Sequence, residues 1–496
     1  MSQQQEFKNI HHKTKIVATV GTACESYEQL KNLVIAGVNV FRLNFSHGSH
    51  EDKKKIIDNI RGINKELGCS IAILGDLQGP KLRVGEIADN RLEVKAGDIL
   101  TFTNEKCIGT LEKIYVSYPN LAGDVVVGNT IMIDDGKIEV MVSSIEKNGD
   151  VKVKVTLGGI ISSKKGINLP GTKVSLPCLT PKDEADLYFG LDHGVDWVAL
   201  SFVRKASDIW DIKEKIKAYG KNTRVIAKIE KPEAIDNLDE IIAATDAIMV
   251  ARGDLGVEMD GAVVPYLQKV MVEKCTAAGK PVIVATQMLE SMITNPVPTR
   301  AETSDVANAV LQGASATMLS GESASGAYPV KAVETMAHIH EVVEQQQNEI
   351  EIVQGNEAAI YFKNHSLSAS TSDNVGLQDR LIAGACRLAR DSKAKAILCI
   401  TNSGYTAFRL SAHRPKADLF VFTSNKELMS TMGLLWGARV FFYDPGTGNA
   451  EKTVAAMVDK LKQDNLLSKG DIFVTTLSVP ANQDKKTNTV QLGVVE

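Results

Sequence analysis

The chain lacks the features that would place it in a membrane, on a secretory route or on a nucleic acid. None of its apolar runs reaches the ~18 residues of a spanning helix, and residues 1–15 contain no apolar signal core. The net charge of −4 argues against a nucleic-acid footprint over the whole molecule. Seven cysteines, an odd number with no Cys-x-x-Cys pair, are typical of reduced thiols. We therefore expect a soluble, cytoplasmic protein with no membrane or nucleic-acid partner.

What the chain does contain is a repeat of short apolar runs. Its 496 residues are enough for several domains, because single cores rarely exceed ~250–300 residues. Most gaps between the runs have helical spacing, as in Asp208–Tyr219 and Pro265–Ala278. Strand–helix alternation eight times over predicts an α/β fold, the (β/α)8 TIM barrel. The predicted strands are Lys15–Val20, Val40–Ser46, Ile71–Asp76, Trp197–Phe202, Arg224–Glu230, Ala247–Asp254, Pro281–Gln287 and Ala316–Glu322.

One gap in this repeat, between Asp76 and Trp197, is far longer than the ~30 residues of a βαβ unit. Inside it, Val151–Val155 alternates between valine and lysine, and Gly, Asp and Asn turns interrupt the segment, which is typical of antiparallel strands. Because barrel chemistry lies at the C-terminal ends of the strands, we expect an inserted small β-barrel domain that forms a lid. The predicted domains are a split catalytic barrel at 1–79 and 178–345 and a lid at 80–177.

Beyond Glu322 the repeat weakens. Glu341–Asn374 predicts a long helix followed by a linker. Further apolar runs then predict a separate C-terminal α/β domain over 346–496. Its strands are Lys395–Thr401, Leu419–Thr423, Ala438–Phe442 and Asp471–Thr476, with a helix at Glu451–Asp464 between the last two.

Two of the buried strands end in charged groups that a buried strand does not need. Lys228-Ile229-Glu230 closes one, and Arg252-Gly253-Asp254 closes the next. Side chains two apart on a strand share a face, so Lys228 and Glu230 should point the same way. Two carboxylates beside a lysine suit a divalent cation with an anionic substrate, since Mg²⁺ is usually held by one or two carboxylates plus substrate phosphate. A structural cluster of ion pairs is the alternative.

The other predicted barrel strands also end in polar groups, so these groups converge on one mouth of the barrel. Capping explains Asn44, Ser46, Thr286 or Ser320 singly as well as function does, but their joint occurrence favours a functional site. The polar strand ends are Arg42-Leu-Asn44-Phe-Ser46-His47-Gly48, Asp76, Thr286-Gln287 and Ser320-Gly321-Glu322.

Together these residues resemble the pyruvate kinase family. The resemblance covers nearly the whole chain, is specific across the barrel and is weaker after Glu341. The family transfers the phosphoryl group of phosphoenolpyruvate to ADP, giving ATP and an enolate that is protonated to pyruvate. Positioning and charge stabilisation do most of the work in such transfers. The matching motifs, in order, are RLNFSHG (42–48), Gly75–Arg83, SKKGINLP (163–170), Lys228–Glu230, MVARGDLG (249–256), ATQMLES (285–291), PTRAETSDVAN (298–308) and MLSGE (318–322).

The resemblance also implies a role for each site residue. Lys228 would stabilise charge on the transferring phosphoryl group and on the enolate oxygen. Glu230 and Asp254 would hold Mg²⁺, with Mn²⁺ as a substitute. The implied catalytic residues are Lys228, Arg42 and Thr286; the substrate-binding residues are Arg42, Lys228, Gly253, Asp254, Thr286 and Ser320; the nucleotide-binding residues are Arg83, Lys165, His47 and Asn44. The family likeness further implies a homotetramer.

One segment departs from the commonest family pattern. Many members use K⁺ as well as Mg²⁺, through Thr-Lys after the aspartate and Glu after Gly-Pro, whereas this chain has Leu77 and Lys81 at the threonine and glutamate positions. The segment resembles the K⁺-independent branch, in which the ammonium of Lys81 would take the electrostatic role of the monovalent cation. Asn44, Ser46 and Asp76 would remain as a vestigial K⁺ site. We expect that K⁺ is not required.

In the C-terminal domain, residues Thr401-Asn402-Ser403-Gly404-Tyr405-Thr406 lie between a predicted strand and a helical pattern. Backbone amides and hydroxyls at such a place can form a phosphate-binding nest. The segment resembles the effector loop of family members activated by sugar phosphates. A plain strand-to-helix turn explains it equally well, and a sugar phosphate or a nucleotide such as AMP remains an open choice of effector.

Two other functions fit part of the pattern. Another Mg²⁺-dependent barrel enzyme of phosphoenolpyruvate or pyruvate, such as an aldolase or a mutase, would need no nucleotide lid, so the insertion and Lys165 argue against it. A catalytically inactive metabolite sensor would not need Arg42, Lys228, Glu230 and Asp254 together.

Overall fold

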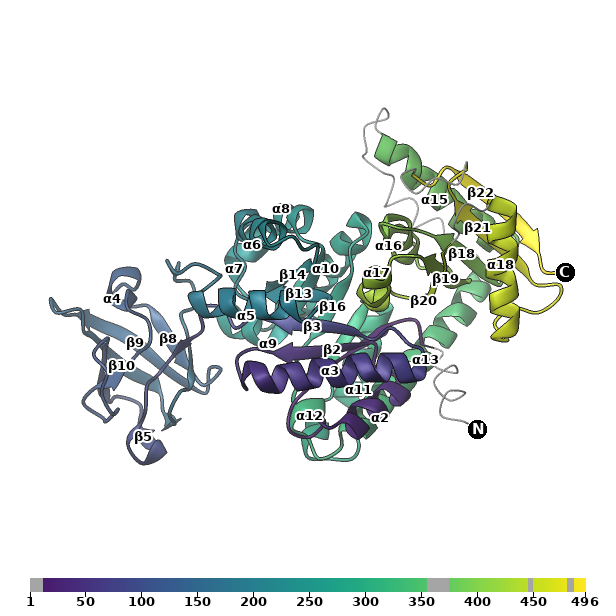
Figure 1. Cartoon of the computed structure of the whole chain (residues 1–496). Helices are drawn as coiled ribbons and strands as arrows, with labels where there is room; N and C mark the ends of the chain where they lie inside the picture. Colours follow the sequence, from purple (N-terminus) through teal and green to yellow (C-terminus); the bar gives the residue numbers. More distant parts are fainter. Residues whose placement is uncertain (1–11, 355–373, 445–448, 480–485) are drawn as a thin grey trace.

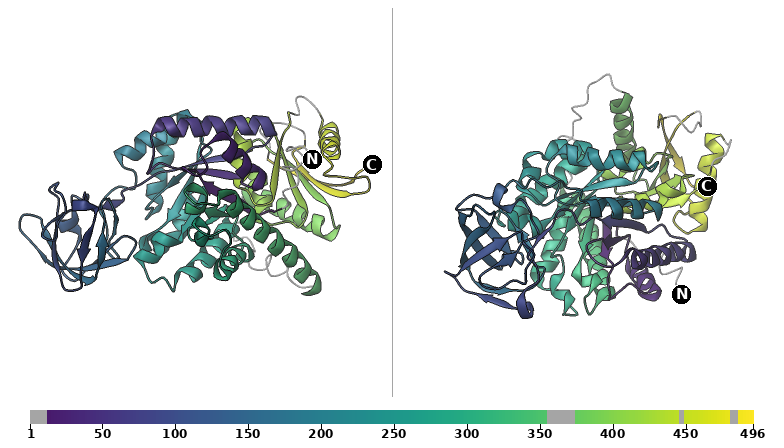
Figure 2. Two further views of the ribbon diagram at one scale, coloured as in Figure 1. Left: turned by 90° about the horizontal axis from the view of Figure 1, so that it is seen from below. Right: turned by 60° about the vertical axis from the view of Figure 1, so that its left-hand side comes forward.

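The computed structural model describes residues 12–354, 374–444, 449–479 and 486–496. A barrel lies at the centre, a mainly β module projects from one side of it, and an α/β unit packs at the other side (Figure 1). The further views keep these three parts in the same order (Figure 2). The fold predicted from the sequence is therefore confirmed in all three parts.

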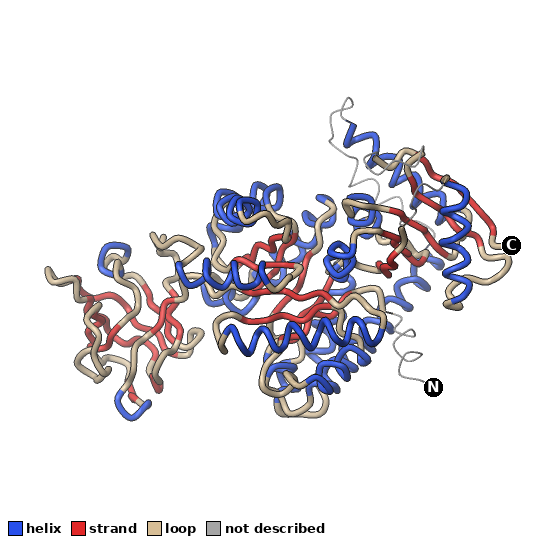
Figure 3. The backbone as a smooth tube through the Cα atoms, viewed as in Figure 1, coloured by secondary structure: helices blue, strands red, loops and turns tan. Residues whose placement is uncertain are grey.

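Eight parallel strands close the central barrel. Every residue of β1, β3, β13, β15, β16 and β17 is buried, as expected for strands covered on both faces. The red strands lie inside a layer of blue helices (Figure 3). In order around the barrel the strands are β1 (Lys15–Thr19), β17 (Ala316–Leu319), β16 (Val282–Ala285), β15 (Ala247–Ala251), β14 (Arg224–Ile229), β13 (Trp197–Leu200), β3 (Ala72–Asp76) and β2 (Val40–Asn44).

The barrel helices begin where the sequence supplies caps. Ser49 and Asp52 form a capping box at α3, and Thr299 and Glu302 do the same at α11. The principal helices of this layer are α2 (Tyr27–Ala36), α3 (His50–Leu67), α5 (Pro181–Asp192), α6 (Ala206–Ala218), α8 (Leu238–Ala244), α10 (Val264–Ala278), α11 (Arg300–Gln312) and α13 (Pro329–Gln354). None of the helices within the described residues is long and apolar enough to cross a membrane.

The inserted module leaves the barrel after β3 and returns at α5. Its core is a curled seven-stranded sheet, and a two-stranded sheet of β11 (Gly159–Ile161) and β5 (Leu92–Val94) lies beside it. The alternation at 151–155 is confirmed, because in β10 the valines are buried and the lysines exposed. In spatial order the seven strands are β4 (Leu82–Arg83), β12 (Gly166–Asn168), β8 (Thr130–Ile133), β9 (Ile138–Ile145), β10 (Val151–Leu157), β6 (Ile99–Thr103) and β7 (Ile114–Tyr115).

The C-terminal unit is a five-stranded sheet, in which only β22 runs antiparallel. Its strands, in spatial order, are β20 (Ala438–Phe442), β19 (Asp418–Thr423), β18 (Ala396–Ile400), β21 (Ile472–Leu477) and β22 (Thr489–Val494). Its described helices are α15 (Asn374–Asp391), α16 (Tyr405–Ala412), α17 (Lys426–Thr431) and α18 (Ala450–Gln463), with a short 3₁₀ turn, η3, at Met432–Leu434.

This unit closes the floor of the barrel, the end at which the strands begin. Inward-facing barrel residues and C-terminal residues belong to one continuous apolar core. At its edge the indole Nε1 of Trp197, the first residue of β13, donates to the carbonyl of Thr431 at 3.0 Å. Lys15, at the start of β1, donates in the same way to Ala438. The opposite end of the barrel, where the strands finish, is the mouth.

Two sequence predictions about local structure need correction. The strand predicted at Ala247–Asp254 ends at Ala251, and Arg252–Glu258 form a short helix, α9. The strand predicted at Ala316–Glu322 likewise ends at Leu319, and the helix α12 (Gly321–Ala324) follows. Asp254 and Glu322 therefore lie in first helical turns, where the helix dipole favours a carboxylate.

Helix α15 and edge strand β22 were not predicted. The edge strand escapes recognition because it is half exposed and does not alternate cleanly between buried and exposed residues. The long helix predicted from Glu341 is confirmed as the end of α13. The linker predicted to follow it lies mostly outside the described residues.

Candidate active site at the mouth of the barrel

Lys228 is the centre of the polar cluster at the mouth. It lies on β14, is almost fully buried, and donates from Nζ to Ser201 Oγ at 2.7 Å. The same Nζ lies 2.9 Å from Glu230 Oε1 and 3.4 Å from Asp76 Oδ1. The prediction that Lys228 and Glu230 share a face is thus confirmed. One ammonium joins the ends of three neighbouring strands.

Arg42, on β2, completes the buried charge cluster. Its Nε and Nη2 both contact Asp76 Oδ2, at 2.6 and 2.5 Å, and its Nη1 donates to Thr19 Oγ1 at 3.0 Å. Asp76 is therefore held between a guanidinium on one oxygen and the Lys228 ammonium on the other. The Arg42 side chain remains partly exposed, so its guanidinium can also bind an anionic ligand at the mouth.

Burial and neighbouring charges shift the pKa values of Lys228, Asp76 and Glu230. Burial lowers the pKa of Lys228, but Asp76 and Glu230 outweigh it and bring the pKa above its usual value. Burial raises the pKa of Asp76, yet Lys228 and Arg42 outweigh it and hold the pKa below its usual value. Lys228 and Asp76 therefore stay charged at neutral pH.

Glu230 behaves differently. Burial raises the pKa of this carboxyl and the charge of Asp254 adds to the rise, although Lys228 opposes both. Its Oε2 accepts a hydrogen bond from the backbone N–H of Phe202 at 2.8 Å, and Phe202 has a left-handed backbone with φ of 57°. A positive φ at a bulky residue is uncommon and indicates local strain at this mouth.

Glu230 and Asp254 are the pair that fits a divalent cation. They interact electrostatically across neighbouring strand ends, and hard cations prefer carboxylate oxygens. A cation between them would relieve the repulsion that contributes to the raised pKa of Glu230. The chemistry of the two donors therefore fits the metal that the sequence predicts.

The seventh strand contributes a second strained loop. Thr286 and Gln287 both have positive φ, 67° and 53°, and Thr286 is β-branched, which makes the left-handed region costly. The Thr286 hydroxyl accepts from Gly253 N at 2.9 Å and donates to Ala285 O. The Arg252 guanidinium holds the loop from below by donating to Thr286 O at 2.6 Å. The sequence-predicted residues Gly253 and Thr286 are thus brought together.

Residues predicted to bind nucleotide lie nearer the inserted module. Asn44 Oδ1 accepts from Ser46 N at 3.0 Å. Burial lowers the pKa of His47, and the charges of Arg83, Lys53, Lys81 and Arg42 lower it further. The Arg83 guanidinium donates to Lys164 O at 2.9 Å, and Lys165 pairs with Asp134 of the module at 2.8 Å. Arg83 and Lys165 thus make these contacts inside the module, while His47 lies in a positively charged neighbourhood.

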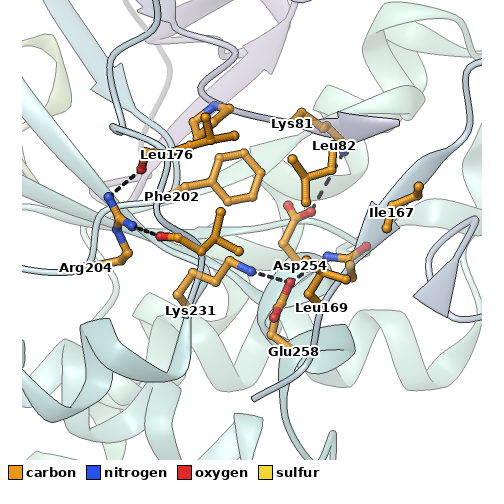
Figure 4. Close-up of a pocket in the computed structure, with 13 residues that line it drawn as sticks. Lys81, Leu82, Ile167, Leu169, Leu176, Phe202, Arg204, Lys231, Asp254 and Glu258 are labelled. Carbon is orange, nitrogen blue, oxygen red and sulfur yellow. Dashed lines mark hydrogen bonds and ion pairs between the residues drawn. The ribbon is translucent and has the colours of Figure 1, made fainter. Parts of the chain in front are cut away.

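Two further predicted site residues, Lys81 and Ser320, each lie beside a carboxylate. Lys81 lies 4.0 Å from Asp254 Oδ1 and is partly exposed (Figure 4). The backbone N–H of Ser320 donates to Glu322 Oε2 at 2.7 Å, and Glu322 Oε1 accepts from Leu289 N. The buried carboxylate of Glu322 therefore ties the loops after β16 and β17 together.

Sequence reasoning missed three contributors to the mouth. Ser201 follows β13 and binds Lys228. Its position at the end of an apolar run was the signal that could have identified it. Thr19 binds Arg42. Glu258, at the end of α9, is buried and holds both Lys231 and Asn168. No spacing in the sequence indicates this last contact, because its members come from three distant segments.

The predicted effector loop lies in the C-terminal unit, between β18 and α16. Asn402 and Ser403 are exposed, Thr401 Oγ1 accepts from Gly404 N at 3.0 Å, and Gly404 has φ of 83°. Tyr405 donates to Asp379 at 2.6 Å and Thr406 pairs with Thr487 at 2.7 Å. The loop is a tight turn with an exposed tip.

A (β/α)8 barrel with a buried lysine between two carboxylates, an aspartate bound by a guanidinium at its mouth and a β module beside it defines a class: barrel enzymes that stabilise anionic groups. Comparison with known proteins narrows the class. Residues 11–333 match the model of the pyruvate kinase barrel domain. Residues 379–492 match the model of the pyruvate kinase alpha/beta domain.

Whole-chain relatives agree with these matches. A pyruvate kinase of Geobacillus stearothermophilus is 42% identical over 97% of this chain and 80% of its own length. One of Clostridium acetobutylicum is 39% identical over 98% of this chain and 100% of its own length. The crystal structure of a pyruvate kinase from Cryptosporidium parvum superimposes with a TM-score of 0.89, at 33% identity, covering 100% of this chain and 98% of that one. The chain belongs to the pyruvate kinase family, and its activity is that of a phosphotransferase of glycolysis.

Proposed function

We propose that the mouth of the barrel transfers the phosphoryl group of phosphoenolpyruvate to ADP, with Lys228 as its central catalytic group. The buried ammonium of Lys228, whose pKa Asp76 and Glu230 bring above its usual value, carries this proposal. Together with Arg42 it offers positive charge where negative charge develops on the phosphoryl group and the enolate oxygen. Thr286 is the third catalytic residue, and its hydroxyl would shape the side on which the enolate is protonated.

We assign the remaining roles as the family resemblance implies them. Substrate is bound by Arg42, Lys228, Asp254, the backbone of Gly253, Thr286 and Ser320. Nucleotide is bound by Arg83, Lys165, His47 and Asn44, of which Lys165 must exchange Asp134 for the nucleotide phosphates. The family uses a divalent cation; we assign Mg²⁺, or Mn²⁺, to Glu230 and Asp254. When bound, this cation supplies charge neutralisation between the phosphate groups.

Synthesis of ATP from phosphoenolpyruvate and ADP with Mg²⁺ tests the proposed reaction. Turnover is expected. A protein that bound these ligands without turnover would instead be a metabolite sensor, and turnover of phosphoenolpyruvate that did not need ADP would point to another barrel enzyme.

We further propose that the enzyme works without K⁺. Both oxygens of Asp76 already face Arg42 or Lys228, and Lys81 adds a positive charge at the mouth. The rate in K⁺-free buffer should stay close to the rate with K⁺, whereas Lys81→Gln should lose rate in K⁺-free buffer and regain part of it with K⁺. A loss of about 100-fold (about 2.7 kcal/mol) in the unmodified enzyme on removing K⁺ would contradict this proposal.

For the rest of the chain, we propose that residues 1–79 and 178–345 form the barrel domain, residues 80–177 the lid and residues 346–496 the C-terminal domain. We also propose a homotetramer and an effector site at Thr401–Thr406. The exposed tip at Asn402 and Ser403 supports the effector site. Initial rates at low phosphoenolpyruvate, with a panel of sugar phosphates and AMP, test it directly.

A further inference from the structure

One buried carboxylate outside the catalytic cluster joins the inserted module to both cation-binding segments. Glu258 Oε1 lies 2.6 Å from Lys231 Nζ and accepts a hydrogen bond from Asn168 Nδ2 at 2.9 Å. The Glu258 side chain is only 2% exposed. Figure 4 shows Glu258 beside Lys231, with Asp254 near it on the same short helix.

Each of the three partners comes from an element with its own functional residue. Lys231 directly follows Glu230, which is assigned to the cation. Glu258 ends α9, the helix that carries Asp254 in its first turn. Asn168 ends β12, where the chain leaves the module, and Lys165 lies just before that strand. A single oxygen thus connects the segments that carry Glu230 and Asp254 with the end of the module at Asn168. We call this connection between the module and the barrel the hinge.

The hinge around this contact is closely packed. Leu82, Ile167, Leu169, Leu176 and Phe202 are among the residues that line a cavity of about 30 Å³, which has room for no more than a water molecule or two. Little free space therefore remains between the packed side chains here. Movement of the module would act through these side chains and through the Glu258 hydrogen bonds.

We propose that Glu258 is a positioning residue that sets the angle of the lid relative to the two cation-binding carboxylates, through Asn168 on one side and Lys231 on the other. The proposal rests on the assigned roles of Lys165, Glu230 and Asp254. Removing the Asn168 contact should loosen the lid alone. Changing Glu258 should disturb both the lid and the cation site, because Lys231 then loses its partner.

The first test uses Asn168→Ala, with Asn104→Ala as a matched control. Asn104 is an exposed module residue whose side chain binds Pro119 O, away from the hinge. We expect Asn168→Ala to lower kcat/KM for ADP about tenfold and leave Mn²⁺ affinity unchanged. In a double-mutant cycle with Lys165→Ala the two losses should not add, because both act through the lid lysine. Additive losses, or equal losses in the control variant, would overturn the proposal.

The second test measures binding of Mn²⁺ alone to the full-length protein by electron paramagnetic resonance. Glu258→Gln should weaken Mn²⁺ binding about tenfold, with a far-ultraviolet spectrum like that of the unmodified protein. Unchanged Mn²⁺ affinity in folded Glu258→Gln would overturn the link to the cation site. A wild-type protein that bound Mn²⁺ but made no ATP would contradict the proposed function, while the Mn²⁺ measurements would still decide the role of Glu258.

Discussion

The mouth and the floor of the barrel bury polar groups in opposite ways. At the mouth, Lys228, Asp76 and Arg42 are buried as charges that compensate one another within 3.4 Å. At the floor, His12 and His340 lie with ring centroids 5.6 Å apart, and burial lowers the pKa of both, to about 4 for His12. Burial therefore keeps this histidine pair neutral, whereas the mouth keeps Lys228 and Asp76 ionised.

The two ways of burying titratable groups differ in what they contribute to stability. Buried ion pairs cost desolvation that their attraction only partly returns, so they are weak evidence for stability. A neutral imidazole costs much less to bury, even though His12 Nε2 and His340 Nδ1 lack hydrogen-bond partners among the described residues. We infer that the charges at the mouth serve substrate binding and transfer, while the floor serves packing against the C-terminal unit.

The largest expected effect comes from removing the central charge of the mouth. Lys228→Met should lower kcat by about 10³-fold, or about 4 kcal/mol, because positive charge at the transferring group is lost. The protein should still fold, since Arg42 continues to pair with Asp76. Steady-state kinetics together with thermal unfolding measure both quantities.

A matched control for this variant is Lys213→Met. Lys213 also forms an ion pair, with Asp246 at 2.9 Å, but lies on a helix outside the barrel. It should keep nearly full activity. Near-normal activity in Lys228→Met, or an equal loss in Lys213→Met, would remove the contrast between the mouth and an ordinary ion pair.

Much of the mouth could be predicted from the sequence, because its polar side chains stand at the C-terminal ends of successive strands along the chain. Lys228, Glu230 and Arg42 are examples, because strand periodicity and the family motifs place them directly. The floor and the hinge could not be predicted. His12 meets His340, and Asn168 meets Glu258, only after the barrel closes, and neither pair has a local signature. Helix α9 escaped prediction because it begins directly after β15, with no loop between them.

The second prediction concerns the floor and its dependence on pH. The pKa of His12 is about 4 in the folded protein and about 6.5 when unfolded. Below pH 6.5 His12 binds a proton in the unfolded chain but not in the folded protein. The free energy of unfolding therefore falls as the pH drops from 6.5 towards 4. The full effect is about 3 kcal/mol, because burial, and then the charges of Lys15 and Arg439, disfavour a charged His12.

His12→Gln isolates this effect, since glutamine stays neutral and can still donate to Thr14 O. The unfolding midpoint in urea should fall more steeply with acid in the unmodified protein than in the variant. A difference between the two proteins that stays constant from pH 7.5 to pH 4 would show that His12 is not a buried neutral group, and the contrast with the mouth would fail.

The smallest effect should come from Ser201, which carries no charge but orients the charge at the mouth. Its hydroxyl accepts from Lys228 and donates to Leu77 O at 2.8 Å, so Ser201→Ala removes one of three partners of Nζ. We expect kcat to fall about tenfold, about 1.4 kcal/mol, as for loss of one hydrogen bond to a charged group. The control is Ser411→Ala, another buried serine that donates to a backbone carbonyl, in the C-terminal unit. If both variants lost only stability, Ser201 would belong with the packing residues of the floor; a loss of kcat confined to Ser201→Ala places it with the charges that it orients.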